Sequence, residues 1–218
     1  MVGRVIDDLR KVFAKTDYDW QIVVVDDGSK DGTAKAAAEH DVKVIPHIIN
    51  IGSGGATATG LSYAQAHDFE IAATLDADGQ HSAEDVLKGI ELIQKLNCDL
   101  LIGSRLIDSQ GMSRVKRLGN KGLTFLTYIL FGVKITDSQS GLRIFSRRAL
   151  NDLKWKTAGF EFCSEMLWRA KQAGLDIREY PIKAIYTEYS LEKGQNNWNG
   201  FNIVKSLLRR RILELFGE

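Results

Sequence analysis

Two aspartates, Asp76 and Asp78, follow directly after an apolar stretch of the sequence and stand just before Gln80. Side chains at positions i and i+2 of a strand point to the same side, so these two carboxylates would lie close together and repel each other. A divalent cation between them would remove the repulsion, and hard oxygen ligands suit Mg²⁺ or Mn²⁺. Gln80 would add a neutral oxygen. The alternative is a solvated turn at the end of a strand, where Asp-Gly pairs are common.

A second pair of carboxylates, Asp26 and Asp27, follows the β-branched run Trp20–Val25. Such a run is typical of a buried parallel strand. A carboxylate at the end of this strand would accept hydrogen bonds from the base or from the ribose hydroxyls of a nucleotide. Alternatively, the polar turn that follows starts the next helix, with Asp31 or Thr33 as its N-cap.

Two further features suit phosphate binding, and each has a plainer alternative. Residues 50–60 are rich in glycine and precede an expected helix, as in loops that cradle phosphates. They lack the lysine of the Walker motif, and close packing of a helix start against a sheet would also favour small residues there. Arg105 follows another apolar run. It would bind a diphosphate or an acceptor phosphate, or form a salt bridge with a neighbouring aspartate.

Four short apolar runs alternate with helical patterns in the first half of the chain, which predicts an α/β fold with a doubly wound, mostly parallel sheet and flanking helices. The expected strands are residues 20–25, 42–48, 70–76 and 98–105, and the expected helices are residues 4–13, 34–40, 50–67 and 82–96, the last with Ser82 as N-cap. Ligands bind beyond the carboxyl ends of such strands. Asp26, Asp76 and Arg105 are therefore expected at one edge of the sheet.

A long apolar helix with a basic start is expected over residues 116–132. It would lie on a bilayer surface with Lys116, Arg117 and Lys121 among the headgroups, or form a buried core helix. The other elements expected in the second half are a loop leading into a strand or short helix at residues 137–150, a helix at 160–174, a strand at 177–186 and a terminal helix at 201–217.

The overall composition narrows the class of protein. The chain has 218 residues, which suits one domain, and its net charge of +1 argues against a nucleic-acid-binding protein. Cys98 and Cys163 lie far apart, and we expect both to be reduced and structural, as in a cytoplasmic protein. The charged start of the chain does not read as a signal peptide. No run of 18 or more apolar residues predicts a transmembrane helix.

Four stretches, "VVVDDGSKDGT", "LDADGQH", "GSR" and "DSQSGLRIF", together resemble the family 2 glycosyltransferases, in which they have the same order and similar spacing. The resemblance covers essentially the whole chain and is strongest to dolichyl- or polyprenyl-phosphate hexose (mannose or glucose) synthases. It implies a GT-A fold and inverting transfer of a hexose from a GDP- or UDP-linked sugar to a lipid phosphate. It also implies a single domain over residues 1–218, with a nucleotide-sugar-binding half at about 1–105 and an acceptor half at about 106–218.

The resemblance also implies roles for individual residues. The nucleotide-sugar site would comprise Asp26, Asp27, Asp76, Ala77, Asp78, Gln80 and Lys193. Within this set the first two face the base and ribose, the alanine contacts the nucleotide through its backbone, and the lysine closes over the site. Asp76, Asp78 and Gln80 would bind Mg²⁺ or Mn²⁺.

On the acceptor side, the resemblance places Arg105, Lys116 and Asn120 at the phosphates. Asp137 matches an acceptor-side base of other family members, so the expected catalytic residues are Asp78, Arg105 and Asp137. The acceptor of this subgroup is already an anionic phosphate, for which a strong base is less necessary.

The sequence departs from the family at three points. The first strand of the family, of the form "V-x-P-x-x-N-E", is not seen, and a sheet without this inner strand would expose unpaired edges. Ser53 stands where many relatives have a basic residue, and an arginine that some mannose synthases have is not found near Thr187. Two alternatives therefore stay open, which are a family 2 enzyme with a saccharide acceptor and a truncated, inactive homologue that acts as a binding module.

The expected partners follow from the same resemblance. They are a nucleotide sugar, a polyprenyl or dolichyl phosphate and the membrane surface, with no nucleic acid. A homo-oligomer or a separate membrane partner is compatible with this reading. The expected location is the cytoplasm, peripheral to the cytoplasmic face of the membrane.

Overall fold

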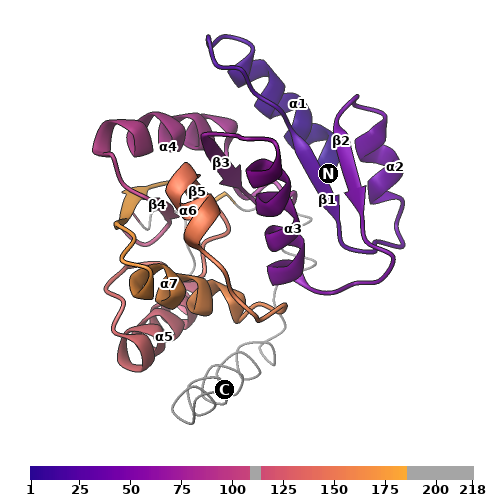
Figure 1. The fold of residues 1–218 in the computed structure, drawn as a ribbon. Coiled ribbons are helices and arrows are strands. Elements are labelled where there is room, and N and C mark those ends of the chain that lie inside the picture. Colours follow the sequence, from indigo (N-terminus) through magenta and orange to yellow (C-terminus); the bar gives the residue numbers. More distant parts are fainter. Residues whose placement is uncertain (109–113, 186–218) are drawn as a thin grey trace.

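The computed structural model describes residues 1–108 and 114–185, and the side chains of residues 114–116 lie outside the described part. Helices and strands alternate through most of it (Figure 1). The helices are α1 (Val2–Phe13), α2 (Thr33–Ala38), α3 (Ser53–Ala66), α4 (Ala83–Leu96), α5 (Arg114–Phe131), α6 (Arg147–Asp152) and α7 (Phe162–Gln172). The strands are β1 (Val23–Asp26), β2 (Lys43–Pro46), β3 (Ile71–Thr74), β4 (Leu100–Ser104), β5 (Arg143–Ser146) and β6 (Ile177–Pro181).

The strands form two separate sheets. In one, β1 and β2 pair in parallel; in the other, the strand order is β3-β5-β4-β6. The strand β5 runs antiparallel to both of its neighbours, β3 and β4, whereas β4 and β6 are parallel. Because β3 and β4 both oppose β5, they run in the same direction and their carboxyl ends meet at one edge. The loops that carry Asp76 and Arg105 therefore begin at the same edge of the sheet, with β5 between them.

Two helices connect the sheets. In Figure 1 the β1–β2 pair lies on one side of α3 and the four-stranded sheet lies on the other. The helix α1 buries Val2 and Ile6 beside the β1–β2 pair, and it buries Leu9 and Phe13 in the core under α4. The apolar face of α1 thus packs into two separate hydrophobic cores.

The strands of the two sheets differ in burial. Every residue of β4 is buried, whereas β3 is half-buried along its whole length and β1 is buried only at Asp26. The side chains of β1 and β3 are largely apolar, so their partial burial reflects position rather than composition. Both are edge strands of their sheets in the described part of the chain.

The structure confirms the α/β fold with flanking helices, and its four-stranded sheet is mixed because β5 alone runs against the other strands. The helix α4 begins where the sequence predicts, because the Ser82 hydroxyl accepts a hydrogen bond from the backbone N–H of Asp85 at 3.0 Å. The expected lack of a first inner strand agrees with the division between β1 and β3, since no strand within 1–108 or 114–185 pairs with their open edges.

Three further expectations can be compared with the structure. Cys98 and Cys163 are free and buried, as expected for structural thiols. The expected terminal helix at residues 201–217 lies outside the described residues. Within the described part of the chain, no helix has the length and apolar character needed to cross a membrane.

Candidate active site

The two carboxylates of the "DAD" motif lie in the loop after β3, and one of them sits against a glycine. A Cβ atom on Gly141 would overlap Oδ2 of Asp76. Part of Asp76 faces solvent, but protein atoms crowd its carboxyl group. This partial desolvation, followed by the negative charge of Asp78, raises the pKa of Asp76, while the positive charges of Arg105 and Arg143 oppose the rise. The four charged groups therefore form one electrostatic cluster.

Gln80 orients Asp78. Its backbone N–H donates to Oδ1 of Asp78 at 2.9 Å, and its side-chain amide donates to Oδ2 at 2.7 Å. Both oxygens of this carboxylate are thus fixed by one neighbour. The predicted role of Gln80 as a metal ligand stays a prediction, whereas its role as a support for Asp78 is visible.

The residues of this loop supply two of the ligands that a divalent cation needs, and a bound substrate would have to supply others. Asp76 and Asp78 supply two hard carboxylates whose mutual repulsion a cation would relieve. No cluster of three or more His, Cys, Asp or Glu suited to a metal occurs within residues 1–108 and 114–185. A cation held by these two carboxylates would need further ligands, such as the oxygens of a substrate phosphate.

Arg105 forms a buried ion pair with Asp137. Its Nε donates to Oδ2 at 2.8 Å and its Nη2 donates to Oδ1 at 3.0 Å, while its backbone N–H also reaches Oδ2 at 3.2 Å. The Asp137 side chain is fully buried and that of Arg105 is 14% exposed. The salt bridge considered as an alternative for Arg105 is therefore present. The role of Asp137 as a base stays a prediction.

Arg143 supports the loop between α5 and β5 through hydrogen bonds. This arginine is 1% exposed, and it donates to the carbonyl oxygens of Ser140 and Ser138 at 3.0 and 2.9 Å. Its guanidinium also lies over the ring of Phe162. Arg143 thus shapes the loop that carries Asp137 and Gly141.

His81 is a buried neighbour of the same cluster. It is 7% exposed, and its Nδ1 has no hydrogen-bond partner within the part of the chain that the structure describes. Burial, followed by the positive charge of Arg105, lowers the pKa of His81 to about 4, although Asp137 acts in the opposite direction. The imidazole is therefore neutral near pH 7.

The two aspartates after β1 have different surroundings. Asp26 is 5% exposed, and its buried Oδ1 has no hydrogen-bond partner among residues 1–108 and 114–185. Asp27 instead accepts hydrogen bonds from His47 and from the backbone N–H groups of Ile51 and Gly52 at 2.8 to 2.9 Å. Burial alone would raise the pKa of Asp27, but these bonds outweigh it and lower the pKa. Asp27 therefore fixes the loop that follows β2.

The glycine-rich loop packs against protein. The backbone N–H groups of Gly54 and Gly55 both donate to the carbonyl oxygen of Ala158. A Cβ on Gly52 or Gly54 would overlap the same backbone. The buried carboxylate of Glu165 holds this segment in turn, since it accepts hydrogen bonds from the backbone N–H groups of residues 156 and 157. The first turn of α3 is thus occupied by residue 158, which favours the close-packing interpretation of these glycines.

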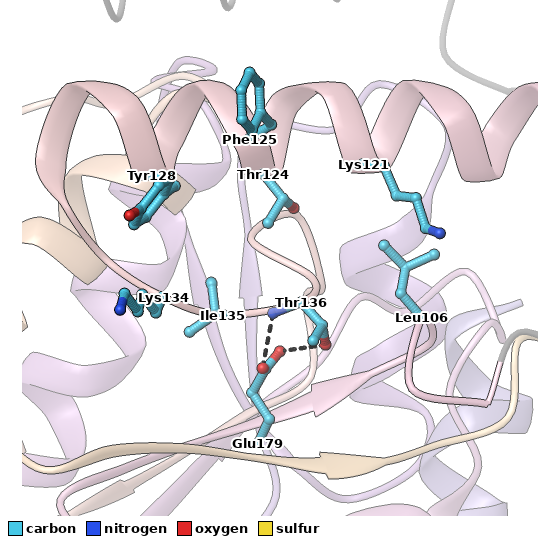
Figure 2. Close-up of a pocket in the computed structure, with 9 residues that line it drawn as sticks. All are labelled: Leu106, Lys121, Thr124, Phe125, Tyr128, Lys134, Ile135, Thr136 and Glu179. Atoms are coloured by element: carbon cyan, nitrogen blue, oxygen red, sulfur yellow. Dashed lines mark hydrogen bonds between the residues drawn. The ribbon is translucent and has the colours of Figure 1, made fainter.

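A groove of about 650 Å³ opens beside the Arg105–Asp137 pair. Figure 2 shows Lys121 and Tyr128 pointing from α5 toward the loop and Glu179. Most of its walls are apolar. The lining residues are Leu106, Lys121, Thr124, Phe125, Tyr128, Lys134, Ile135, Thr136 and Glu179.

The remaining predicted site residues are placed in part. Asn120 lies on α5 and is half-buried. Lys116 belongs to the same helix, but its side chain lies outside the described part, and Lys193 lies outside the described residues. Ala77 is exposed between the two aspartates.

Sequence reasoning missed three residues that shape the site, which are Gly141, Arg143 and Glu179. The first two belong to the "DSQSGLRIF" stretch, so the motif itself was a signal for them. Glu179 had no such signal, because its partners lie 42 and 43 positions earlier in the chain.

Comparisons with known proteins agree with this geometry. Residues 1–154 match the model of the family described as Glycosyl transferase family 2. The UDP-N-acetylglucosamine–dolichyl-phosphate N-acetylglucosaminyltransferase of Methanococcus voltae is 41% identical, over 97% of this chain and 91% of its own length. The polyprenol monophosphomannose synthase of Mycolicibacterium smegmatis is 29% identical, over 86% and 74%.

Comparison with a solved structure supports the same α/β fold. Glucosyl-3-phosphoglycerate synthase from Mycobacterium tuberculosis, in complex with Mn²⁺, UDP-glucose and phosphoglyceric acid, superposes with a TM-score of 0.69. The match covers 96% of this chain and 74% of that one at 20% identity.

Proposed function

Because the chain belongs to the family 2 glycosyltransferases, we propose that it transfers a sugar from a nucleotide sugar to a polyprenyl or dolichyl phosphate. An oxygen of the lipid phosphate attacks the anomeric carbon, the bond from that carbon to the nucleoside diphosphate breaks, and the configuration inverts. The chain is a glycosyltransferase with the GT-A fold. The observation that carries the acceptor assignment is the buried Arg105–Asp137 pair beside an apolar groove.

The donor would lie between the ends of β1 and β3. The Oδ1 of Asp26, which has no partner in the described part of the chain, would accept from an N–H group of a base, and the exposed residue Ala77 would contact the nucleotide through its backbone. UDP-N-acetylglucosamine is the first donor to test, since the name of the Methanococcus voltae relative includes it. GDP-linked sugars are the second choice.

Asp76 and Asp78 would hold Mg²⁺ or Mn²⁺, and the cation would offset the negative charge that develops on the departing diphosphate. Gln80 keeps Asp78 in place through its two hydrogen bonds. The solved glucosyl-3-phosphoglycerate synthase contains Mn²⁺ together with UDP-glucose, which supports a cation of this kind.

The acceptor phosphate would meet Arg105, with Lys116 and Asn120 as further contacts. An arginine held by a bidentate pair presents a fixed cation to an anionic oxygen. The apolar groove would receive the isoprenoid units next to the phosphate, and exposed Lys121 lies at its wall.

The helix α5 would lie on the membrane surface. Its exposed apolar side chains include Leu118, Phe125 and Ile129, with exposed fractions of 75%, 62% and 61%. The helix has four basic residues and no acidic one. This combination is typical of helices that bind anionic bilayers.

The thermal stability of the protein with UDP and with GDP, each with and without Mn²⁺, tests the donor site. A nucleotide at a hundred times its dissociation constant adds about 2.7 kcal/mol to the free energy of unfolding. The stabilisation should require both nucleotide and cation, disappear in Asp78→Ala and persist in Asp19→Ala, which alters an exposed aspartate between α1 and β1. Absence of any stabilisation in the wild type would contradict the enzyme site and favour a binding module.

Transfer assays then test the acceptor. Labelled sugar should appear on dolichyl phosphate and should not appear on the corresponding free alcohol, since the phosphate is the proposed nucleophile. Transfer to an oligosaccharide in place of the lipid phosphate would contradict the acceptor assignment while leaving the donor site intact.

A further inference from the structure

Three hydrogen-bond donors converge on the carboxylate of Glu179, which lies on β6 at the floor of the groove. Its Oε2 accepts from the backbone N–H of Thr136 at 2.7 Å. Its Oε1 accepts from the Thr136 hydroxyl at 2.8 Å and from the backbone N–H of Asp137 at 3.1 Å. Figure 2 shows the two bonds to Thr136.

These bonds connect Glu179 to Arg105 through one intermediate residue, Asp137. Glu179 fixes the backbone of Asp137, and the Asp137 carboxylate holds the guanidinium. The strands agree with this connection, because Glu179 on β6 pairs with Ile102 on β4, and Arg105 follows the end of β4. The arginine and its distant support are thus carried by neighbouring strands.

Other contacts hold the loop at different points. Arg143 supports the carbonyl oxygens of Ser138 and Ser140, and the Ser138 backbone N–H donates to Thr124. At residues 136 and 137, Glu179 accepts from both backbone N–H groups, and the Oγ of Ser104 lies 2.6 Å from the Oγ1 of Thr136. The Asp137 carboxylate also accepts from the backbone N–H groups of Arg105 and Gln139. Glu179 therefore sets the part of the loop from which the ion pair projects.

We propose that Glu179 is a positioning residue for the transfer reaction, which fixes Thr136 and Asp137 so that Asp137 holds Arg105 at the acceptor phosphate. The inference rests on the proposed function in one respect, the identity of the acceptor. A carboxylate is required because both of its oxygens accept hydrogen bonds. The amide of a glutamine would direct N–H groups at one of the backbone donors.

The test compares Glu179→Ala and Glu179→Gln with Glu91→Gln, which alters an exposed glutamate on α4. We expect Glu179→Ala to lower kcat/KM for dolichyl phosphate by about tenfold or more, as the loss of one positioning interaction does. The donor KM and the stabilisation by nucleotide with Mn²⁺ should stay unchanged. Glu179→Gln should fall between the wild type and Glu179→Ala, and Glu91→Gln should behave as the wild type.

Coupling to Arg105 distinguishes positioning from general stabilisation. In an Arg105→Lys background, the added effect of Glu179→Ala on the acceptor kcat/KM should shrink to about twofold or less, because residues that act as a unit are not additive. Equal effects in both backgrounds would overturn the inference. The inference would also be overturned if the kinetic parameters for the donor and for the acceptor both worsened in proportion to the decrease in Tm.

A nuclear magnetic resonance measurement tests the inference independently of the transfer activity. The Nε–H of Arg105, held by Asp137, should give a slowly exchanging signal, which Arg105→Lys removes and thereby assigns. In Glu179→Ala this signal should broaden or exchange faster, and a persistent, unchanged signal would contradict the positioning role. If dolichyl phosphate is not a substrate while this signal responds, the acceptor assignment fails and the positioning role stands.

Discussion

At the scale of single residues, the contact between Gly141 and Asp76 links two motifs that lie far apart in the sequence. The backbone of Gly141 has no positive φ, so its requirement for glycine is purely steric. The Asp76 carboxylate occupies the space in which any Cβ would lie. The geometry of the carboxylate pair therefore depends on the "SGLR" turn.

We predict that Gly141→Ala displaces Asp76 and weakens cation-dependent nucleotide binding by about tenfold or more, since misplaced groups of this kind cost factors of that order or larger. The binding of UDP with Mn²⁺ by calorimetry measures the effect. Gly60→Ala is the matched control, because a Cβ there would make ordinary contact with Val25. Wild-type affinity in Gly141→Ala would show that Asp76 tolerates the displacement or does not hold the cation.

His81 gives a prediction for stability against pH. Its pKa is about 4 in the folded protein and 6.5 in a model peptide. Between these values the unfolded chain binds a proton that the folded chain does not, so the free energy of unfolding falls as the pH falls through this window. The linkage amounts to about 3 kcal/mol, an order-of-magnitude value, and it is fully lost below pH 4.

Urea denaturation at several pH values between 7 and 4 checks this prediction. His81→Gln removes the titrating group, so its stability should decline less steeply than that of the wild type over the same window. The difference between the two curves isolates His81 from carboxylates that titrate nearby. Parallel curves would mean that His81 becomes protonated in the folded protein without penalty.

The sequence pointed to candidate residues of the site but not to the residues that support them. Asp76, Asp78 and Arg105 are identifiable because strand ends carry them beside recognisable motifs. The role of Glu179 depends on hydrogen bonds across 42 and 43 positions. Such bonds leave no periodic pattern in a single sequence.

At the scale of elements, α5 has an exposed apolar face for which the described residues provide no cover. Leu118, Phe125 and Ile129 recur at helical spacing and are all more than half exposed. The opposite side of the helix packs into the main core through Leu123, Leu126 and Leu130. Core packing therefore accounts for one face of this helix, and membrane contact stays a prediction for the other.

We predict that the double variant Phe125→Ser with Ile129→Ser lowers binding to anionic vesicles by about tenfold or more, because full burial of each large apolar side chain contributes about 1.5–3 kcal/mol. Co-sedimentation with phosphatidylglycerol vesicles measures the binding. The control is Ile48→Ser with Ile49→Ser in the loop after β2, which removes two exposed isoleucines elsewhere. Equal losses in both double variants would point to nonspecific adsorption, and no loss would contradict the role of α5.

Strand order was harder to predict than the strands themselves. The apolar runs located β1, β2, β3 and β4 to within a few residues. The segment that forms β5 and α6 was expected as a loop leading into a strand or a short helix, and the structure contains both. Its insertion between β3 and β4 rests on long-range packing of Ile144 and Phe145, which are fully buried. No local propensity encodes that choice.

At the scale of the whole molecule, the division into two sheets suggests unequal local stability. The β1–β2 pair has few fully buried side chains, whereas β4 is buried along its whole length and paired on both sides. Regions with few buried apolar contacts open at lower free energy. The proposed donor would contact both parts, through Asp26 and Asp76.

We predict that amides of Val23–Asp26 exchange with solvent hydrogen faster than amides of Leu100–Ser104, and that UDP with Mn²⁺ slows the first group more than the second. A ligand that bridges two parts stabilises the weaker one selectively. Hydrogen exchange followed by mass spectrometry measures both groups. Uniform protection by the ligand would contradict the bridging position of the donor.

The place of β5 in the sheet has a consequence for the chain as it leaves the ribosome. Thr74 at the end of β3 contacts Gly141, 67 positions later, so β3 and β4 are both synthesised before the strand that separates them. Synthesis adds about 5–20 residues per second, so several seconds, as an order of magnitude, separate the synthesis of these apolar strands from that of their partner β5. During that interval their edges are open to other chains, which is the condition under which a nascent chain is prone to aggregate.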